Sequence, residues 1–205
     1  MSPRKAAALR DGGDLTLREH LIATAERLLG ERGSAGLTVR VIAREAGVAD
    51  GVLYNHFADK EELLAVALRA HVKAVERTLP ALPEPGGGTV EANLRVHIEH
   101  GLAMHRAILP ALTGMLAQPN VLARFAALNE PDDWRDRLAA YLLAEAELGR
   151  LAPGARVDAA TSMIVGVCHE AVLSTLFQGT AEPPPSKDVD DLVAAVLDGI
   201  GPSRT

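Results

Sequence analysis

Hydrophobic positions recur at helical spacing along most of this 205-residue chain, and segments rich in glycine or proline separate the successive stretches. Apolar residues three and four positions apart lie on one face of a helix. The spacing predicts helices over 15–33, 38–46, a short stretch ending at 57, 59–78, 89–108, 110–128, 132–148, 156–178 and 187–199. No stretch shows the alternating pattern of a strand. We therefore predict an all-α fold.

Residues 15–57 hold the most specific local pattern, in which glycines separate three short helical stretches. Projected at 100° per residue, Leu53 and Phe57 share one face of the third stretch and point inward. The opposite face and its flanks carry small or hydrogen-bonding residues: Gly51, Val52, Tyr54, Asn55 and His56. A short helix of this kind, held across a tight turn by another helix, is the arrangement of a helix-turn-helix. A solvated surface helix can carry the same residues, so the spacing alone leaves DNA binding and a structural role open.

The segments "GLTVRVIA" and "AGVADGVLYNHFADKEEL" resemble the N-terminal domain of the TetR/AcrR family of bacterial transcriptional repressors. The similarity covers about residues 15–65, and the rest of the chain is similar only in outline. Residues 1–14 are small, polar and glycine-containing, which predicts a disordered tail. The resemblance implies a helix-turn-helix DNA-binding domain at 15–62 and a larger helical ligand-binding and dimerisation domain at 63–205. It also implies three partners: double-stranded DNA, a small-molecule effector and a second copy of the chain.

The resemblance further implies roles for individual residues. Thr38 matches the N-cap of the second helix and a phosphate contact, and Arg40 matches a position at which arginine reads guanine. A guanidinium group can bond to both O6 and N7 of guanine, so this role is chemically reasonable. Lys60 matches a lysine that meets a phosphate at the start of the fourth helix. The full set of predicted DNA-binding residues is Thr38, Arg40, Gly51, Val52, Tyr54, Asn55, His56 and Lys60.

Two positions depart from the family pattern. Ala49 stands where relatives usually have a serine N-cap, and alanine has no side-chain acceptor for capping. Asp50 could take over the cap, but its negative charge would lie close to the DNA backbone. Val52 replaces a common threonine, which removes a hydroxyl but keeps a methyl group for thymine contact. Both changes weaken the sequence-independent part of DNA binding.

The last two predicted helices contain long apolar surfaces. The helix at 187–199 has a single apolar stripe that includes Val193 and Val196, whereas the helix at 156–178 is apolar on nearly every side. A helix that is apolar all round must be covered on two faces. The second cover could be another subunit or the chain's own core. We favour a homodimer.

The central helices carry candidate residues for an effector site. Methionine, aromatic and histidine side chains would form a mainly apolar pocket with a few polar groups. The predicted ligand-binding residues are His97, His100, Met104, Met115, Phe125, Cys168 and His169. The alternative is that the apolar members of this set are simply core residues. Histidines 97 and 100 are three residues apart and could chelate a metal, but no acidic partner is evident, so no metal site is predicted.

Composition and charge narrow the remaining choices. The net charge is −6, but residues 1–60 hold nine Lys and Arg against eight Asp and Glu, which permits DNA binding without indicating it. A single cysteine, Cys168, excludes an internal disulfide and fits a reducing compartment. Neither a signal-peptide pattern nor an uncharged apolar run of about 18 residues is present. We predict a cytoplasmic protein that is not bound to a membrane.

No phosphate-binding glycine loop, nucleophile elbow or zinc-protease motif occurs in the sequence, so we predict neither an enzyme nor a cofactor. The prediction is a ligand-responsive regulator, a repressor that binds a palindromic operator as a homodimer and is released by a small, mainly apolar effector. The alternative is a helical protein that binds or sequesters small molecules and carries a vestigial DNA-binding module. Salt-dependent binding to a palindromic duplex separates the two.

Overall fold

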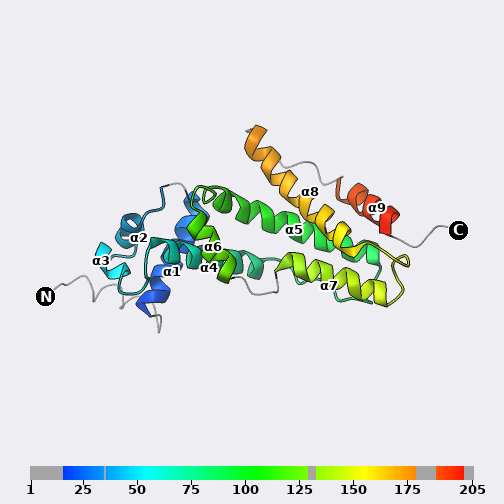
Figure 1. Cartoon of the computed structure of the whole chain (residues 1–205), viewed down its shortest axis with the longest axis horizontal. Coiled ribbons are helices and arrows are strands. Elements are labelled where there is room, and N and C mark those ends of the chain that lie inside the picture. Colours follow the sequence, from blue (N-terminus) through cyan, green and yellow to red (C-terminus); the bar gives the residue numbers. More distant parts are fainter. Residues whose placement is uncertain (1–15, 35, 129–132, 179–187, 201–205) are drawn as a thin grey trace. The chain divides into compact units, whose positions relative to one another are not determined.

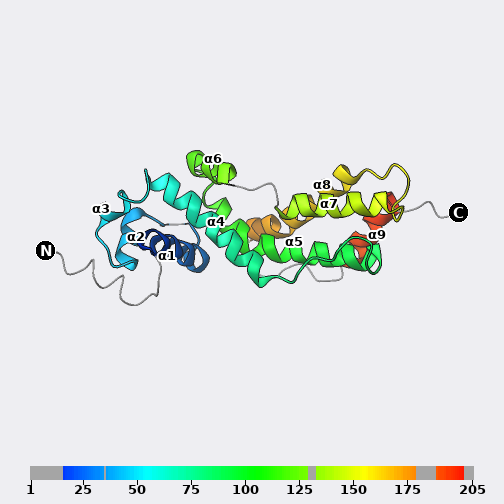
Figure 2. The same ribbon diagram turned by 90° about the horizontal axis from the view of Figure 1, so that it is seen from below.

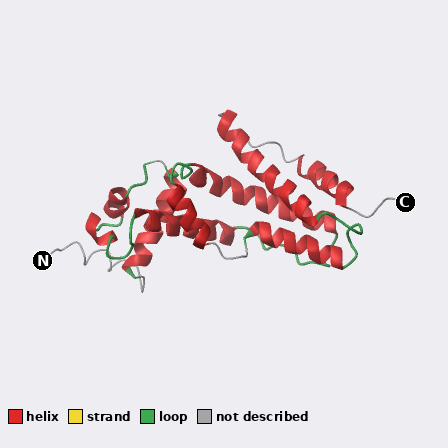
Figure 3. Cartoon of the chain, viewed as in Figure 1, coloured by secondary structure: helices red, strands yellow, loops and turns green. Residues whose placement is uncertain are grey.

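The computed structural model describes residues 16–34, 36–128, 133–178 and 188–200, and within these ranges all regular structure is helical (Figures 1 and 3). The predicted all-α fold is confirmed. The helices are α1 (Leu17–Arg32), α2 (Val39–Glu45), α3 (Asp50–Leu53), α4 (Lys60–Thr78), α5 (Val90–Thr113), α6 (Pro119–Leu128), α7 (Trp134–Glu147), α8 (Val157–Gln178) and α9 (Asp188–Ile200). The predicted tail at 1–14 lies outside the described residues.

Helix α5 runs through Pro110, where the sequence predicts a break between two helices, and that prediction is wrong. Proline removes one backbone donor from a helix. The helix nevertheless continues to Thr113, and the residue after the proline, Ala111, is buried in a hydrophobic core. The chain leaves the helical path at Gly114 instead, where a Cβ atom would overlap the Ser34 hydroxyl. Helix α6 then begins at Pro119, a residue that the first turn of a helix tolerates.

The described residues divide into two compact units. The first unit comprises the described residues of Met1–Thr78 and Ala107–Asn129, and the second comprises those of Leu79–Arg106 and Glu130–Thr205. Each unit has its own hydrophobic core. The first unit therefore holds more of the chain than the predicted helix-turn-helix domain at 15–62, whose functional boundary remains a prediction.

The core of the first unit joins helices α1 to α4 with α6. In Figure 2, α1, α2 and α3 lie together, and α4 extends from this group. Helix α4 packs against both α1 and α6. The largest fully buried side chains of this core are Leu21, Leu28, Leu29, Ile42, Leu53, Leu63, Leu64, Leu68 and Met115. These packed helices form a rigid support for the short segment α2–α3.

The core of the second unit joins the N-terminal part of α5 with α7, α8 and α9. Trp134 of α7 lies against Gly101 of α5, where a Cβ atom would overlap the indole ring, so this close approach requires glycine. On α9, Val193 and Val196 are each only 2% exposed. The apolar stripe of α9 is thus covered by the chain's own core.

Candidate nucleic-acid interface

The predicted cap of α2 is confirmed. Thr38 has extended backbone angles, and its side-chain oxygen accepts a hydrogen bond from the Val41 N–H at 3.2 Å. This bond satisfies one of the backbone donors that a helix start leaves without a partner. After α2, Gly47 adopts a positive φ of 70°, a conformation that favours glycine, and the chain turns into α3. The Thr38 cap thus marks the start of α2, and the turn at Gly47 follows its end.

The start of α3 has no side-chain cap. Ala49 is the N-cap residue, and it makes no side-chain hydrogen bond, as its missing acceptor predicts. The idea that Asp50 replaces the cap is wrong in this structure. The Asp50 carboxylate accepts instead from the Nε–H of Arg40 at 3.4 Å, across the turn between the two helices.

Helix α3 is shorter than the stretch predicted to end at residue 57. It ends at Leu53, and the chain continues in a turn in which the N–H groups of His56 and Phe57 both donate to the Leu53 carbonyl oxygen at 3.0 Å. The turn still places both apolar side chains inward, since Leu53 is 2% exposed and Phe57 is 3% exposed. The predicted inward face is therefore confirmed, although the helix is not continuous.

The predicted DNA-contacting residues lie on the outside of this core. The Arg40 side chain is 86% exposed and Tyr54 is 58% exposed. The remaining members are exposed or half-buried: Thr38, Gly51, Val52, Asn55, His56 and Lys60. An added Cβ at Gly51 would meet no atom within 4 Å, so glycine is not required there by the protein's own packing. The surface is free to approach a partner, and the individual DNA contacts remain predictions.

The start of α4 is held from two directions. The Asp59 carboxylate accepts from the Glu62 N–H at 2.9 Å and so caps this helix. The Glu62 carboxylate accepts from the Ala58 N–H at 2.7 Å. Arg124 of α6 also donates to Asp59, a contact that sequence reasoning missed because no local pattern links residues so far apart. Lys60, the predicted phosphate contact, thus sits on a fixed helix start.

In the second unit, His97 is 1% exposed, and its ring centroid lies 4.5 Å from that of Tyr141. Burial lowers the pKa of the His97 imidazole to about 4, with smaller contributions from the nearby positive charges of His100 and Arg137. Within the described part of the chain, neither ring nitrogen has a hydrogen-bond partner. Among the described residues, the Nε1–H of Trp134 and the hydroxyl of Thr161 are also buried without a hydrogen-bond partner. Buried polar groups usually have partners, so these atoms could receive a ligand or water.

His105, Trp134 and His169 form an aromatic group that the sequence did not predict. The His105 ring lies 4.8 Å from His169 and 5.4 Å from Trp134, centroid to centroid. Its Nδ1–H donates to the Gly101 carbonyl oxygen at 2.7 Å. Cys168 precedes His169 but is fully buried, and burial raises the pKa of its thiol to about 12. The thiol is therefore protonated and unreactive at neutral pH.

The structure divides the predicted effector residues between the two units. Met115 is fully buried in the core of the first unit, and Phe125 packs against that core. Met104 and Cys168 belong to the core of the second unit, and the His100 imidazole bonds to the Pro80 carbonyl oxygen at 3.2 Å. Apolar periodicity predicts that such residues are buried, but it does not predict in which core. The predicted set is thus not one cluster.

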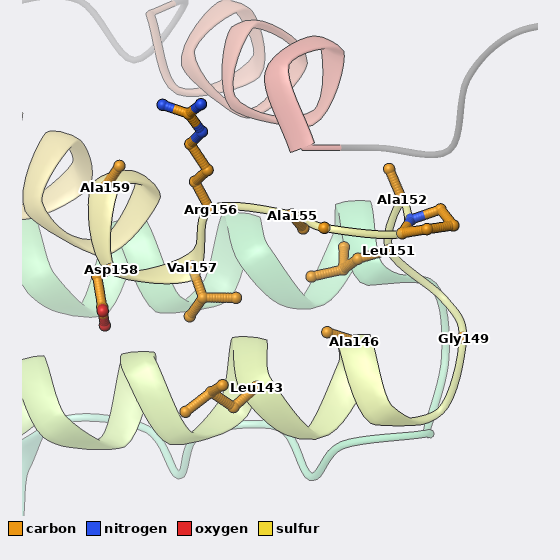
Figure 4. Close-up of a pocket in the computed structure, with 12 residues that line it drawn as sticks. Leu143, Ala146, Gly149, Leu151, Ala152, Ala155, Arg156, Val157, Asp158 and Ala159 are labelled. Carbon is orange, nitrogen blue, oxygen red and sulfur yellow. The ribbon is translucent and has the colours of Figure 1, made fainter.

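A surface pocket of about 780 Å³ lies between α7 and the start of α8 (Figure 4). Leu143, Leu151 and Val157 supply much of its apolar wall. Arg156 also borders it, but Figure 4 shows its side chain directed away from Leu143. None of the seven predicted effector residues lines this pocket.

Helix α8 presents an uncovered apolar face. Met163 is 57% exposed, Val167 37% and Phe177 85%. Among the described helices, α8 alone is long and apolar enough to cross a membrane, over Val157–Thr175, and 39% of its most apolar window is buried. Because Ile164 and Cys168 of this helix pack in the second core, we interpret α8 as a core helix with one open face.

Comparison with known proteins shows a family likeness in the N-terminal helices. Residues 21–67 match the family model for bacterial regulatory proteins of the tetR family. The chain is 30% identical over 103 residues to the HTH-type transcriptional repressor NemR of Escherichia coli K12, a match that spans 49% of this chain and 52% of NemR. The chain thus spans about half the length of this curated relative. The predicted resemblance is confirmed.

Solved structures extend the likeness to nearly the whole fold. A transcriptional regulator from Rhodococcus sp. Rha1 aligns with a TM-score of 0.66 and 20% identity, over 92% of this chain and 100% of that one. The flavonoid-responsive regulator FrrA aligns with a TM-score of 0.66 and 23% identity, over 92% and 98%. At such identities the comparison shows the fold, an N-terminal helix-turn-helix followed by a helical C-terminal region.

Proposed function

We propose that this chain, which carries the helix-turn-helix domain of the TetR family of transcriptional regulators, is a cytoplasmic repressor that binds a palindromic DNA operator as a homodimer. The observation that carries the proposal is the arrangement of α2 and α3. Leu53 and Phe57 are buried in the core, whereas Arg40 and Tyr54 are exposed on the outer surface. This arrangement can present both α3 and the Arg40 side chain of α2 to a major groove.

The proposed contacts divide into base reading and backbone positioning. Arg40 reads a guanine through two hydrogen bonds, whereas Thr38, Tyr54 and Lys60 position the domain on phosphates. The groove-facing residues are Gly51, Val52, Asn55 and His56. The capped start of α4 supports the backbone role of Lys60, because Asp59 fixes that helix end.

Binding titrations on an operator duplex and a scrambled duplex, at several salt concentrations, test this division. Arg40→Ala is expected to cost about 1–3 kcal/mol on the operator and to relax preference at one base pair per half-site. Lys60→Ala is expected to weaken binding to both duplexes alike and to reduce the salt slope by about one unit. Identical behaviour of the two variants on every duplex would contradict the assigned roles.

The proposed homodimer uses the open face of α8. Met163, Val167 and Phe177 are exposed on α8, and an exposed apolar surface of this kind can mark an interaction site. Two copies related by a two-fold axis would cover this face and place two recognition helices on successive major grooves. Half-sites should then be centred about 34–36 Å apart, or a multiple of that spacing.

The proposed effector is a small, mainly apolar molecule bound within the second unit. The buried polar atoms of His97, Trp134 and Thr161, which lack partners among the described residues, support this location, because a ligand with hydrogen-bonding groups would satisfy them. The effector releases DNA only if it favours the conformation that does not bind the operator. A tenfold loss of operator affinity requires about 1.4 kcal/mol of differential binding. Apolar ligands, unlike phosphates or sugars, are expected to raise the melting temperature and weaken operator binding.

A second candidate is a helical protein that sequesters small molecules and has lost DNA binding. The uncapped start of α3 at Ala49 and the carboxylate of Asp50 beside Arg40 favour this candidate, since both weaken attraction to DNA. Enrichment of a palindromic sequence from a random pool of duplexes would support the regulator. Ligand binding without any enriched duplex would support the sequestering protein.

A further inference from the structure

The contact between Arg40 and Asp50 lies on the surface that we propose faces DNA. The Nε–H of Arg40 on α2 donates to the Asp50 carboxylate on α3 at 3.4 Å, and the two side chains are 86% and 52% exposed. We propose that Asp50 is a positioning residue for sequence specificity, which orients the Arg40 guanidinium towards a guanine and lowers affinity for other DNA. This inference rests on the proposed function, because it assigns a partner role within the same interface.

The geometry of the guanidinium group supports the orienting role. Arginine has one N–H on Nε and four on its two terminal nitrogens. A bond from Nε to Asp50 leaves both terminal nitrogens available for the O6 and N7 acceptors of guanine. Once formed, the same bond fixes the direction of the long Arg40 side chain.

The strength of the pair should depend on DNA. Between exposed groups in water, such an ion pair contributes little. A bound duplex excludes water from the pair and lowers the local dielectric constant, which strengthens the attraction between the two charges. The orienting effect therefore operates mainly in the complex, where it bears on specificity.

The charge of Asp50 supports the second effect. Binding to any DNA sequence depends on attraction between basic residues and phosphates. A carboxylate beside Arg40 offsets that arginine's charge and repels phosphates, so it lowers affinity for every duplex. A uniform loss of this kind cancels in the ratio of specific to non-specific affinity. The ratio rises because a correct guanine also gains from the oriented guanidinium group, whereas an incorrect base does not.

Helix capping does not explain the carboxylate, although an acidic side chain in the first turn of a helix is favourable. Ala49 rather than Asp50 occupies the N-cap position of α3, and that position makes no side-chain cap bond. The Asp50 side chain is directed across the turn to α2 instead. A role towards Arg40 accounts for this placement.

The test uses the full-length protein and a duplex that the wild-type protein selects from a random pool, with a scrambled duplex of the same composition. Asp50→Ala is expected to bind the scrambled duplex severalfold more tightly, with a salt slope steeper by about one unit. For Asp50→Ala, the ratio of specific to non-specific affinity is expected to fall about tenfold. A loss of this size is what the loss of one base contact would cause. Asp50→Asn, which loses the charge but keeps an acceptor, should fall between Asp50→Ala and the wild type.

Two controls separate this role from simpler ones. Glu61→Gln removes one negative charge from the same unit at the start of α4, so it should tighten binding to both duplexes without changing their ratio. In an Arg40→Ala background, Asp50→Ala should no longer change the ratio, because the residue that it positions is absent. Melting temperatures of all variants identify any that are unfolded.

An unchanged ratio for folded Asp50→Ala and Asp50→Asn would overturn the inference while leaving the proposed function intact. The same would follow if the ratio fell equally with and without Arg40. If the wild-type protein enriches no duplex at all, the proposed function itself fails, and the inference fails with it.

Discussion

Arg124 of α6 donates two hydrogen bonds to the Asp59 carboxylate, from its two terminal nitrogens to the two carboxylate oxygens, at 2.6 and 2.7 Å. Paired bonds of this kind are among the stronger ion contacts in proteins. The same carboxylate caps α4 through the Glu62 N–H. One side chain thus connects the start of α4, next to Lys60, with a helix that lies 65 residues further along the chain.

These contacts predict a stability that is lost in acid. The cap bond from the Glu62 N–H, with help from Arg124, holds the pKa of the Asp59 carboxyl below its ordinary value. Because the folded-state pKa is lowered, the stabilisation is present above the ordinary pKa of about 3.9 and is lost as pH falls through the lowered one. Asp59→Asn should lower the urea midpoint at pH 7 and flatten its decline below pH 4.

A second variant distinguishes the contribution of the Arg124 ion pair from that of the cap bond to the Glu62 N–H. Arg124→Met removes the ion pair but keeps the cap, so its midpoint at pH 7 should lie between those of Asp59→Asn and the wild type. Urea titrations between pH 7 and pH 3 measure both effects. An equal acid decline in wild-type and Asp59→Asn proteins would contradict this assignment.

Local patterns in the sequence predicted the structure correctly where it depends on residues that are close together along the chain. The inward placement of Leu53 and Phe57 and the cap at Thr38 follow from helical geometry and hydrogen-bond chemistry within a few residues. The break predicted at Pro110 failed, although proline is unfavourable inside a helix. The structure places the next residue, Ala111, in the core of the first unit, and local patterns do not show that packing.

Contacts between distant segments could not be predicted. No periodicity relates Arg124 to Asp59, and the spacing of apolar residues does not assign Met115 to the first unit and Cys168 to the second. The orientation of α9 is another example, since an amphipathic stripe predicts a covered face but not what covers it. In this chain the cover is the second core, where Val193 is buried.

The contact between Gly101 and Trp134 predicts a specific loss of stability. Gly101→Ala should destabilise the protein by about 1–3 kcal/mol, because the new methyl group overlaps the indole ring. Gly166→Ala on α8 is the matched control. A Cβ atom there meets nothing within 4 Å, so alanine should be neutral or stabilising by up to about 1 kcal/mol. Equal unfolding midpoints for the two variants would show that the indole ring can move aside.

Burial of neutral His97 predicts a second pH effect. Its pKa in the folded protein is about 4, against 6.5 ordinarily, so the unfolded chain takes up a proton first as pH falls. The stabilisation is complete above pH 6.5 and is lost progressively down to pH 4, with a total on the order of 3 kcal/mol. His97→Leu should show a shallower decline in the free energy of unfolding across this window. A decline as steep as that of the wild type would assign the effect to other groups.

A substitution at Gly51 should change the affinity for DNA without lowering the stability of the protein. Since an added Cβ meets no protein atom within 4 Å, Gly51→Ala should leave the melting temperature unchanged or slightly higher. If α3 approaches DNA closely, the methyl group should nevertheless weaken operator binding about tenfold. Unchanged affinity would mean that Gly51 does not lie against the duplex.

The open face of α8 predicts which substitutions separate subunits. Val193→Glu and Val196→Glu, suggested by the stripe on α9, would place a charge in the chain's own core and unfold it, since both valines are 2% exposed. Met163→Glu and Phe177→Glu should instead yield a folded monomer that has lost tight operator binding. Leu116→Glu is the control, because Leu116 is 68% exposed but belongs to the first unit. The mass of each variant in solution and its affinity for the operator test this prediction. A Met163→Glu protein that remains a dimer and binds the operator normally would exclude this face as the interface.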